Sequence, residues 1–300
     1  MHARCLRHGG CSRARPTFDV SGSPCQPWSG RGHRQGKESP DIVLFLVWCK
    51  LIRHVRPYVV VHENVPGFDS SLLEHCLGDR FDIVTLHTSP KHCGFTLLNR
   101  TRVYSTLMLR GETELVRPLQ HAYAYVSQVL ARTIEKMDIS WCCVATSDCL
   151  LTTENARRHR GGLSPVLEPS GDWSYFLTAK QQAYLDHYLS SRRTNNDASF
   201  VCDLSQNPKH RRTQLCRDGA MPTFTRPTML WVVSLKRWLL PCEMAFAMGL
   251  PITDGAAACA QVQKDTSEYS RAVVGNMMHV ACVGTILSVA LSCVAPRVQI

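Results

Sequence analysis

Short apolar segments with strand character alternate with helical segments through the first third of the chain. Strands are predicted at 17–20, 58–62 and 81–87, helices at 41–54 and 70–77, and a further strand at 102–109. This alternation predicts a parallel α/β sheet, which binds ligands at the carboxyl ends of its strands. We therefore expect an α/β fold in which this region forms half of a doubly wound domain.

A cysteine follows the first predicted strand, in Ser23-Pro24-Cys25-Gln26-Pro27. The two prolines fix the backbone φ angle on either side of Cys25, so the loop presents the thiol in one orientation. This suits a nucleophile, although an ordinary turn that contains a cysteine is the alternative, since local cysteine signatures transfer poorly between families. Glu63 follows the strand at 58–62, so a parallel sheet places Cys25 and Glu63 at the same edge.

Four more motifs follow this loop in a fixed order. They are Glu63-Asn64-Val65, Asn99-Arg100-Thr101-Arg102, Leu240-Pro241-Cys242-Glu243 and Val274-Gly275-Asn276. Together with Pro-Cys-Gln, this ordered set resembles the cytosine-5 DNA methyltransferase family. The resemblance implies a partial Rossmann-like methyltransferase sheet with an irregular inserted target-recognition domain.

The resemblance also implies a chemistry and a set of site residues. A Cys25 thiolate adds to carbon 6 of a flipped cytosine, and Glu63 hydrogen-bonds to or protonates ring nitrogen 3. Carbon 5 then takes a methyl group from S-adenosylmethionine, after which a base removes the carbon 5 proton and the cysteine leaves. Arg100 or Arg102 holds the exocyclic oxygen or a phosphate. The implied substrate-binding residues are Gln26, Ser29 and Asn64, and the implied cofactor-binding residues are Pro24, Gly275 and Asn276.

The chain departs from the family pattern mainly in the cofactor half. No Phe-x-Gly-x-Gly loop and no following acidic residue precede Ser23, Leu98 stands where the arginine motif normally has glutamine, and Met277 follows Gly275-Asn276 where serine is usual. We therefore expect a truncated or split methyltransferase that transfers little methyl alone, with a second chain as a potential source of the cofactor half. The alternatives are a non-catalytic DNA-binding relative and an RNA cytosine methyltransferase.

The predicted domains are a basic tail at 1–16, catalytic parts at 17–110 and 236–300, and a target-recognition domain at 111–235. Within these, helices are expected at 120–136 and 239–247, and the rest of the insert is irregular. The formal net charge is +10, with basic residues gathered before residue 40 and between 192 and 217. Basic surfaces favour polyanions through counterion release, so double-stranded DNA is the expected partner, although a generic basic protein would show the same charge.

The fifteen cysteines are irregularly spaced in a long chain without the apolar core of a signal peptide, which favours a reducing compartment: the nucleus in a eukaryote, otherwise the cytoplasm. Two cysteine groups lack paired Cys-x-x-Cys spacing, so no metal is expected; they are Cys142, Cys143 and Cys149, and Cys202, His210 and Cys216. The apolar run 277–295 is long enough to raise a membrane span, but its polar residues indicate a helix buried in protein.

Overall fold

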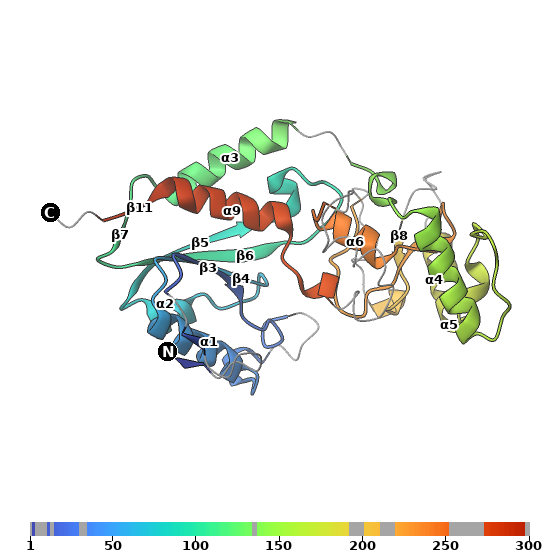
Figure 1. The fold of residues 1–300 in the computed structure, drawn as a ribbon, viewed down its shortest axis with the longest axis horizontal. Helices are drawn as coiled ribbons and strands as arrows, with labels where there is room; N and C mark the ends of the chain where they lie inside the picture. The colour runs from blue at the N-terminus through green and yellow to red at the C-terminus, as the bar shows by residue number, and fades with distance from the viewer. Residues whose placement is uncertain are drawn as a thin grey trace. The chain divides into compact units, whose positions relative to one another are not determined.

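The computed structural model describes residues 2–3, 11–12, 15–29, 35–133, 137–191, 201–210, 220–251 and 273–297 (Figure 1). The chain divides into two compact units. Unit 1 comprises Met1–Ser89, Thr101–Val129 and Gly284–Ile300, and unit 2 comprises Pro90–Arg100 and Leu130–Val283. The limits of these units differ from those of the predicted functional domains, which stay a prediction.

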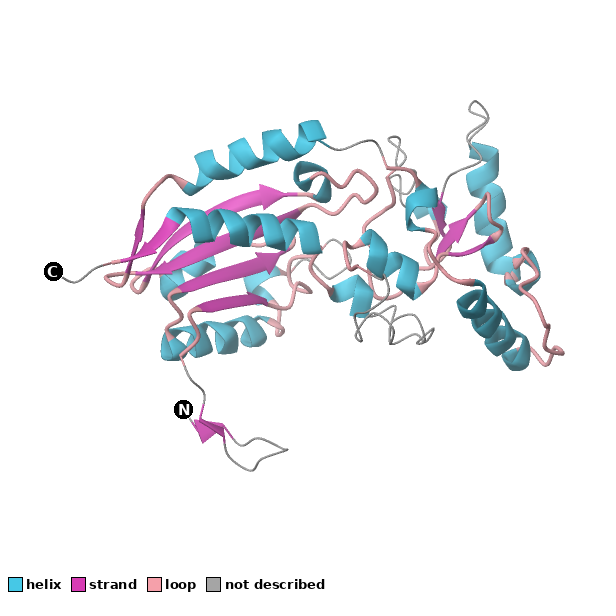
Figure 2. Ribbon diagram, turned by 45° about the horizontal axis from the view of Figure 1, so that its top comes forward, coloured by secondary structure: helices cyan, strands magenta, loops and turns pink. Residues whose placement is uncertain are grey.

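Unit 1 is built on a four-stranded sheet of order β3-β4-β6-β5 (Figure 2). Its strands are β3 (Phe18–Gly22), β4 (Val59–Asn64), β5 (Phe81–Thr88) and β6 (Arg102–Leu109). All the strands and helices predicted up to residue 109 are present, with ends shifted by at most two residues. The expected α/β class is confirmed.

The sheet is mixed, so the expectation of a purely parallel sheet was wrong. β3 pairs with β4 in parallel, whereas β6 runs antiparallel to both β4 and β5. The chain leaves β5 and enters β6 at the same end of the sheet. Such a return makes β6 an antiparallel neighbour of β5 and needs no crossover helix. The alternation of element types does not reveal this reversal.

Helices cover both faces of this sheet (Figure 1). α1 (Ile42–Val55) and α2 (Ser71–Leu77) lie on one face, and most of α3 (Leu119–Thr133) and of α9 (Val280–Cys293) on the other. Helix α1 buries Phe45, Cys49 and Ile52, spaced i, i+4 and i+7, as one helical face does. These side chains join Val60, Leu73, Leu77, Phe81, Val103 and Leu107 in one core.

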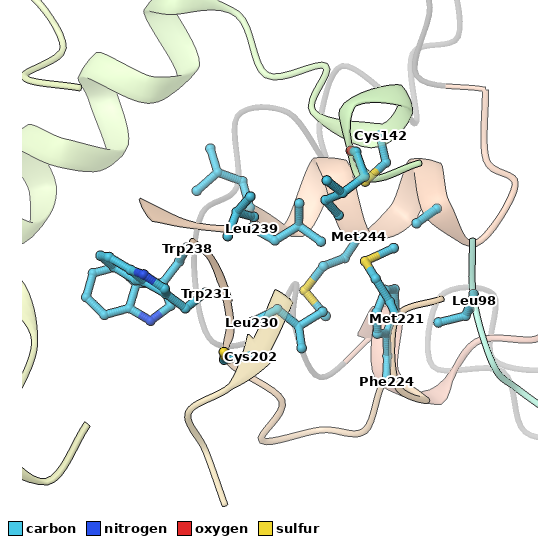
Figure 3. Close-up of a cluster of buried hydrophobic side chains, with 14 of the residues drawn as sticks. Leu98, Cys142, Cys202, Met221, Phe224, Leu230, Trp231, Trp238, Leu239 and Met244 are labelled. Carbon is cyan, nitrogen blue, oxygen red and sulfur yellow. The ribbon is translucent and has the colours of Figure 1, made fainter. Parts of the chain in front are cut away.

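Unit 2 contains a small antiparallel sheet of order β10-β9-β8. Its strands are β8 (Val201–Asp203), β9 (Leu230–Val232) and β10 (Arg237–Trp238), and its helices are α4 (Ser147–Arg160), α5 (Ala179–Ser191) and α6 (Pro241–Ala247). Figure 3 shows the core of this unit, where Met221, Phe224, Trp231, Trp238 and Met244 gather.

Helices α4 and α5 correct the expectation that the insert is irregular outside 120–136. Helix α4 buries only Thr153 and Glu154, so its sequence carries little apolar periodicity. It is fixed instead by polar contacts: Thr146 accepts a hydrogen bond from the Cys149 backbone as N-cap, and the buried Glu154 carboxylate accepts one from Trp173 Nε1 at 3.0 Å.

The remaining elements are short. They are strand pairs β1 (His2–Ala3) with β2 (Cys11–Ser12) and β7 (Thr113–Leu115) with β11 (Val294–Pro296), and the 3₁₀ turns Gly36–Glu38, Pro90–Cys93, Ile139–Cys142, Ser174–Phe176 and Pro208–His210. Within the predicted basic tail, Arg15 is held in place: it donates to Glu112 at 2.9 Å and to the Arg56 carbonyl at 2.6 Å.

One helical stretch, Val273–Cys293, is long and apolar enough to cross a bilayer by length and composition. Residues 277–279 interrupt it, and α9 itself has 14 residues, fewer than the roughly 20 needed for a span. Helix α9 buries one face, formed by Cys282, Ile286, Val289, Ala290 and Cys293. This one-sided burial is typical of a helix packed in protein, as the sequence predicted.

Candidate active site

One edge of the unit 1 sheet brings together three of the predicted motifs. Gly22, at the end of β3, pairs with Glu63 near the end of β4, and Glu63 pairs with Tyr104 near the start of β6. Because β6 is reversed, its first residue Arg102 reaches the edge where β3 and β4 end. In a purely parallel sheet the start of a strand would lie at the opposite edge, so the reversed strand is what makes an Arg102 site with Glu63 possible.

Cys25 lies in a tight turn at this edge. The backbone N–H groups of Trp28 and Ser29 both donate to the Cys25 carbonyl, at 3.0 and 2.8 Å. Pro27 is buried, Cys25 is half-buried and Gln26 is exposed. The turn therefore has a fixed backbone while the Cys25 side chain keeps partial access to solvent, as a nucleophile requires.

The end of β4 holds the cysteine loop through Ser23. Asn64 Nδ2 donates to the Ser23 hydroxyl at 3.0 Å and to its carbonyl at 3.3 Å. His62 Nε2 lies 2.9 Å from the same hydroxyl and accepts from the Ser23 backbone N–H at 3.3 Å. Asn64 thus supports the loop, whereas a contact with substrate stays a prediction for this residue.

His62 was not predicted as part of the site. Its ring is fully buried and packs against Trp48, Phe68 and Phe45, with centroids 4.5, 5.2 and 6.4 Å away. Burial in these apolar surroundings lowers the pKa of His62 to about 3. The only sequence signal was a histidine within an otherwise apolar strand, immediately before Glu63-Asn64.

We expect the free energy of unfolding to fall as the pH drops from about 6.5 towards 3. In the unfolded chain His62 takes up a proton near the ordinary histidine pKa of 6.5, whereas in the folded chain it stays neutral until about pH 3. Protons therefore bind the unfolded state preferentially, with a slope that approaches about 1.4 kcal/mol per pH unit from this group. Urea titrations at pH 7, 6 and 5 on the natural chain and on His62→Gln measure the difference in slope. Equal slopes would contradict the expectation.

Glu63 and Arg102 form an ion pair at the same edge. Arg102 Nε lies 2.9 Å from Glu63 Oε1, and each side chain is only 14% exposed. Partial exclusion of water strengthens such a pair and fixes the orientation of the carboxylate. The structure therefore brings together Cys25, Glu63 and Arg102 of the predicted catalytic residues at one sheet edge.

Arg100 belongs to unit 2, where its guanidinium binds backbone. Nη1 donates to the Phe224 carbonyl at 3.0 Å and Nη2 to the Met277 carbonyl at 2.8 Å, and the residue is 3% exposed. In the structure Arg100 links two chain segments through these hydrogen bonds. Its predicted catalytic role stays a prediction.

The residues predicted to bind the cofactor are divided between the two units. Pro24 lies in unit 1, whereas Gly275 and the exposed Asn276 lie in unit 2. A Cβ atom on Gly275 would come within 2.5 Å of the Thr225 backbone, so this glycine permits close packing of the chain on itself. That contact explains the glycine through packing, and the role of these three residues in binding S-adenosylmethionine stays a prediction.

Of the other predicted residues, one lies in the cysteine turn and several lie outside the described part. Ser29 is half-buried and contributes its backbone to the cysteine turn. Arg192, Arg193, Arg211, Arg212 and Arg217 of the basic insert lie outside the described residues. Among the described residues, no group of three His, Cys, Asp or Glu side chains could hold a metal. Cys216, which belongs to one of the predicted cysteine groups, lies outside the described residues.

Comparison with known proteins supports the resemblance in sequence. Residues 16–82 match the family model of the C-5 cytosine-specific DNA methylases. The orphan methyltransferases M.SPRI of Bacillus phage SPR and M.Rho11sI of Bacillus phage rho11s are each 37% identical over 71 residues, which is 23% of this chain. The aligned part spans only 15% and 13% of those relatives. The matched family segment contains the Cys25 and Glu63 motifs but not Arg102.

Solved structures extend the likeness in fold to most of the chain. The S. pombe Dnmt2 methyltransferase has a TM-score of 0.53 at 17% identity, over 92% of this chain and 77% of that one. An E. coli prophage protein described as a putative DNA modification methyltransferase has a TM-score of 0.56 at 14% identity, over 93% and 80%. The resemblance to the cytosine-5 methyltransferase family that the motifs predicted is confirmed in sequence over residues 16–82.

Proposed function

We propose that this chain supplies the cytosine-binding half of a DNA (cytosine-5)-methyltransferase. The observation that carries the proposal is the sheet edge at which the Cys25 turn and the Glu63–Arg102 pair lie together. A thiol, a carboxylate and a guanidinium are the groups that nucleophilic activation of a cytosine ring requires. The similarity of residues 16–82 to C-5 cytosine-specific DNA methylases supports DNA as the substrate.

Each residue has one role in the proposed reaction. The Cys25 thiolate forms a bond to carbon 6, and the electron pair of the 5–6 double bond moves towards carbon 5. Glu63, in its protonated form, donates a hydrogen bond or its proton to ring nitrogen 3, and Arg102 donates to the exocyclic oxygen, so that negative charge developing on the ring is stabilised. A stacked base is out of reach of these groups, so the target nucleotide must rotate out of the duplex.

S-adenosylmethionine is the methyl donor that the family implies, and it supplies an electrophilic methyl group to carbon 5. Packing against the Thr225 backbone accounts for Gly275 without this donor. The proposal therefore includes a partner surface on which a cofactor-binding half docks.

The surface best suited to such a partner is the outer edge of β3 with the outward side of α1. Within the described residues β3 pairs only with β4, so its other edge presents unpaired backbone groups. Phe18 and Val20 on β3 are 39% and 43% exposed, and Val43, Leu44, Leu46 and Val47 on α1 are 47–59% exposed. Exposed apolar side chains together with an open strand edge suit added strands and helices of the same sheet.

A complementation assay tests the proposed function. The chain is mixed with duplex DNA, labelled S-adenosylmethionine and a separately produced cofactor-binding half of a complete relative. We expect methyl transfer to DNA only in the complete mixture, and its loss when Phe18 and Val20 are both replaced by lysine. Exposed Leu167, on a loop of unit 2, gives the matched control Leu167→Lys, which should retain transfer.

Two results would contradict the proposal. Robust transfer by the isolated chain would show that this chain's own residues hold the donor. Transfer to RNA but not to DNA would show that RNA is the substrate.

The cellular location is proposed from the relatives. M.SPRI and M.Rho11sI are phage proteins, which favours the non-nuclear alternative for location.

A further inference from the structure

Two thiols that are 93 positions apart in the sequence meet inside unit 2. Cys149 lies in the first turn of α4 and Cys242 in the first turn of α6, and their Sγ atoms are 4.0 Å apart. They are not joined by a disulfide. A movement of about 2 Å would bring the sulfurs to bonding distance, which side-chain rotation can supply.

The two thiols differ in a way that suits stepwise oxidation. Cys149 is half-buried, and the hydrogen bond from the Cys242 thiol lowers its pKa. Cys242 is 2% exposed, and the pKa of its thiol is raised, first by that same hydrogen bond and then by burial. The accessible sulfur therefore has the greater thiolate character, and the buried sulfur is placed to react second.

Two other thiol pairs are close but less suited. Cys142 and Cys143 are adjacent in sequence, so a disulfide between them would force a strained ring through one peptide bond. Cys49 interacts with Cys76 between α1 and α2, but burial raises the pKa of Cys49. Among the described cysteines, Cys149 combines a thiol partner 4.0 Å away and distant in sequence with partial access to solvent and a lowered pKa.

We propose that Cys149 and Cys242 form a peroxide-sensitive dithiol site that closes to a disulfide linking α4 to α6. The Cys149 thiolate attacks one oxygen of hydrogen peroxide: a sulfur–oxygen bond forms, the oxygen–oxygen bond breaks, and the leaving hydroxide becomes water. Cys242 then attacks the Cys149 sulfur and displaces hydroxide, which takes the Cys242 proton. Two thiols are oxidised, and one peroxide is reduced to two waters.

The bond would act next to a buried charged group. Glu243 adjoins Cys242 on α6, and its carboxylate accepts from the Ala145 backbone shortly before α4. The disulfide would therefore reinforce a connection between these helices that already exists, and would close a long loop that includes α5. A disulfide lowers the conformational entropy of the unfolded chain, and the effect is larger when the loop that it closes is long. Oxidation is therefore expected to stabilise the folded state of unit 2.

Peptide mapping tests this site on the full chain. The reduced protein is treated with limiting hydrogen peroxide, alkylated with N-ethylmaleimide under denaturing conditions, and digested with trypsin and Asp-N, which separates Cys149 from Cys142 and Cys143. We expect peptide 148–157 linked to peptide 238–253, released by dithiothreitol. The thermal unfolding midpoint of unit 2 should rise by about 5 °C on oxidation.

Matched variants decide between this site and unspecific oxidation. Cys149→Ser and Cys149→Ala should abolish both the linked peptides and the rise in midpoint, whereas Cys76→Ser should retain both. Thermal unfolding of the reduced variants shows whether they fold. Cys149 recovered as a sulfinic acid or linked to Cys142 or Cys143, with Cys242 fully alkylated, would overturn the proposal.

Discussion

Replacement of Cys25 by alanine is expected to reduce hydrogen exchange at carbon 5 of cytosine in DNA by at least about 10³-fold. Addition of a thiolate to carbon 6 makes carbon 5 basic, so it takes up a deuteron from heavy water, loses its original proton and releases the cysteine. This exchange reports on Cys25, Glu63 and Arg102 without any methyl donor. The isolated chain should therefore exchange slowly but measurably.

Mass spectrometry of nucleosides after incubation in heavy water measures this exchange. Cys76→Ala is the matched control, since Cys76 is also a half-buried thiol of unit 1 but lies on α2. Glu63→Gln tests the acid separately, and should slow exchange without loss of DNA binding. Unchanged exchange in Cys25→Ala would remove the nucleophile from the proposal, whatever the outcome of the complementation assay.

Removal of Arg237 is expected to destabilise unit 2 by about 3–5 kcal/mol, because it leaves the Glu243 charge buried without its partner. Arg237 donates two hydrogen bonds to Glu243, at 2.7 and 2.8 Å, and the Glu243 side chain is fully buried. The same carboxylate accepts from the Leu240 backbone at 2.9 Å and so caps α6.

Urea unfolding of Arg237→Met measures this loss through the fluorescence of Trp231 and Trp238, which are buried in unit 2. The double variant Arg237→Met with Glu243→Gln should recover part of the stability, because no unpaired charge remains. Lys236→Ala is the control, since Lys236 forms an exposed pair with Asp172 and its removal should change little. A loss no greater than in this control would contradict the expectation.

Local patterns in the sequence sufficed for the elements and for the residues at the ends of β3 and β4. Apolar alternation at 102–109 predicted β6 to the residue, because a buried strand leaves a clear local pattern. Its direction was missed, since direction depends on where the chain returns to the sheet and not on the composition of the strand. Helix α4 was missed because hydrogen bonds to Glu154, rather than an apolar stripe, hold it.

Some residues of the candidate site could likewise be predicted from local motifs, and others could not. Cys25, Glu63 and Arg102 were predicted from short motifs, and they lie at one sheet edge. His62 was missed, because a histidine that supports a loop through one hydroxyl group has no spacing rule of its own. Arg100 and Arg102 looked equivalent in the sequence, and only the contacts of Arg100 with the Phe224 and Met277 carbonyls separate them.

The contacts between the two loops at this edge limit how the site can be transplanted or evolved. Besides the hydrogen bonds of Asn64 and His62 to Ser23, the Gly67 backbone lies so close to Trp28 that a Cβ atom on Gly67 would come within 2.9 Å of the Trp28 carbonyl oxygen. A graft of residues 22–29 into another sheet would lose its alignment unless residues 62–67 moved with it. Residues 22–29 and 62–67 therefore behave as one structural unit, and we expect a substitution in one segment to be tolerated only with a compensating substitution in the other.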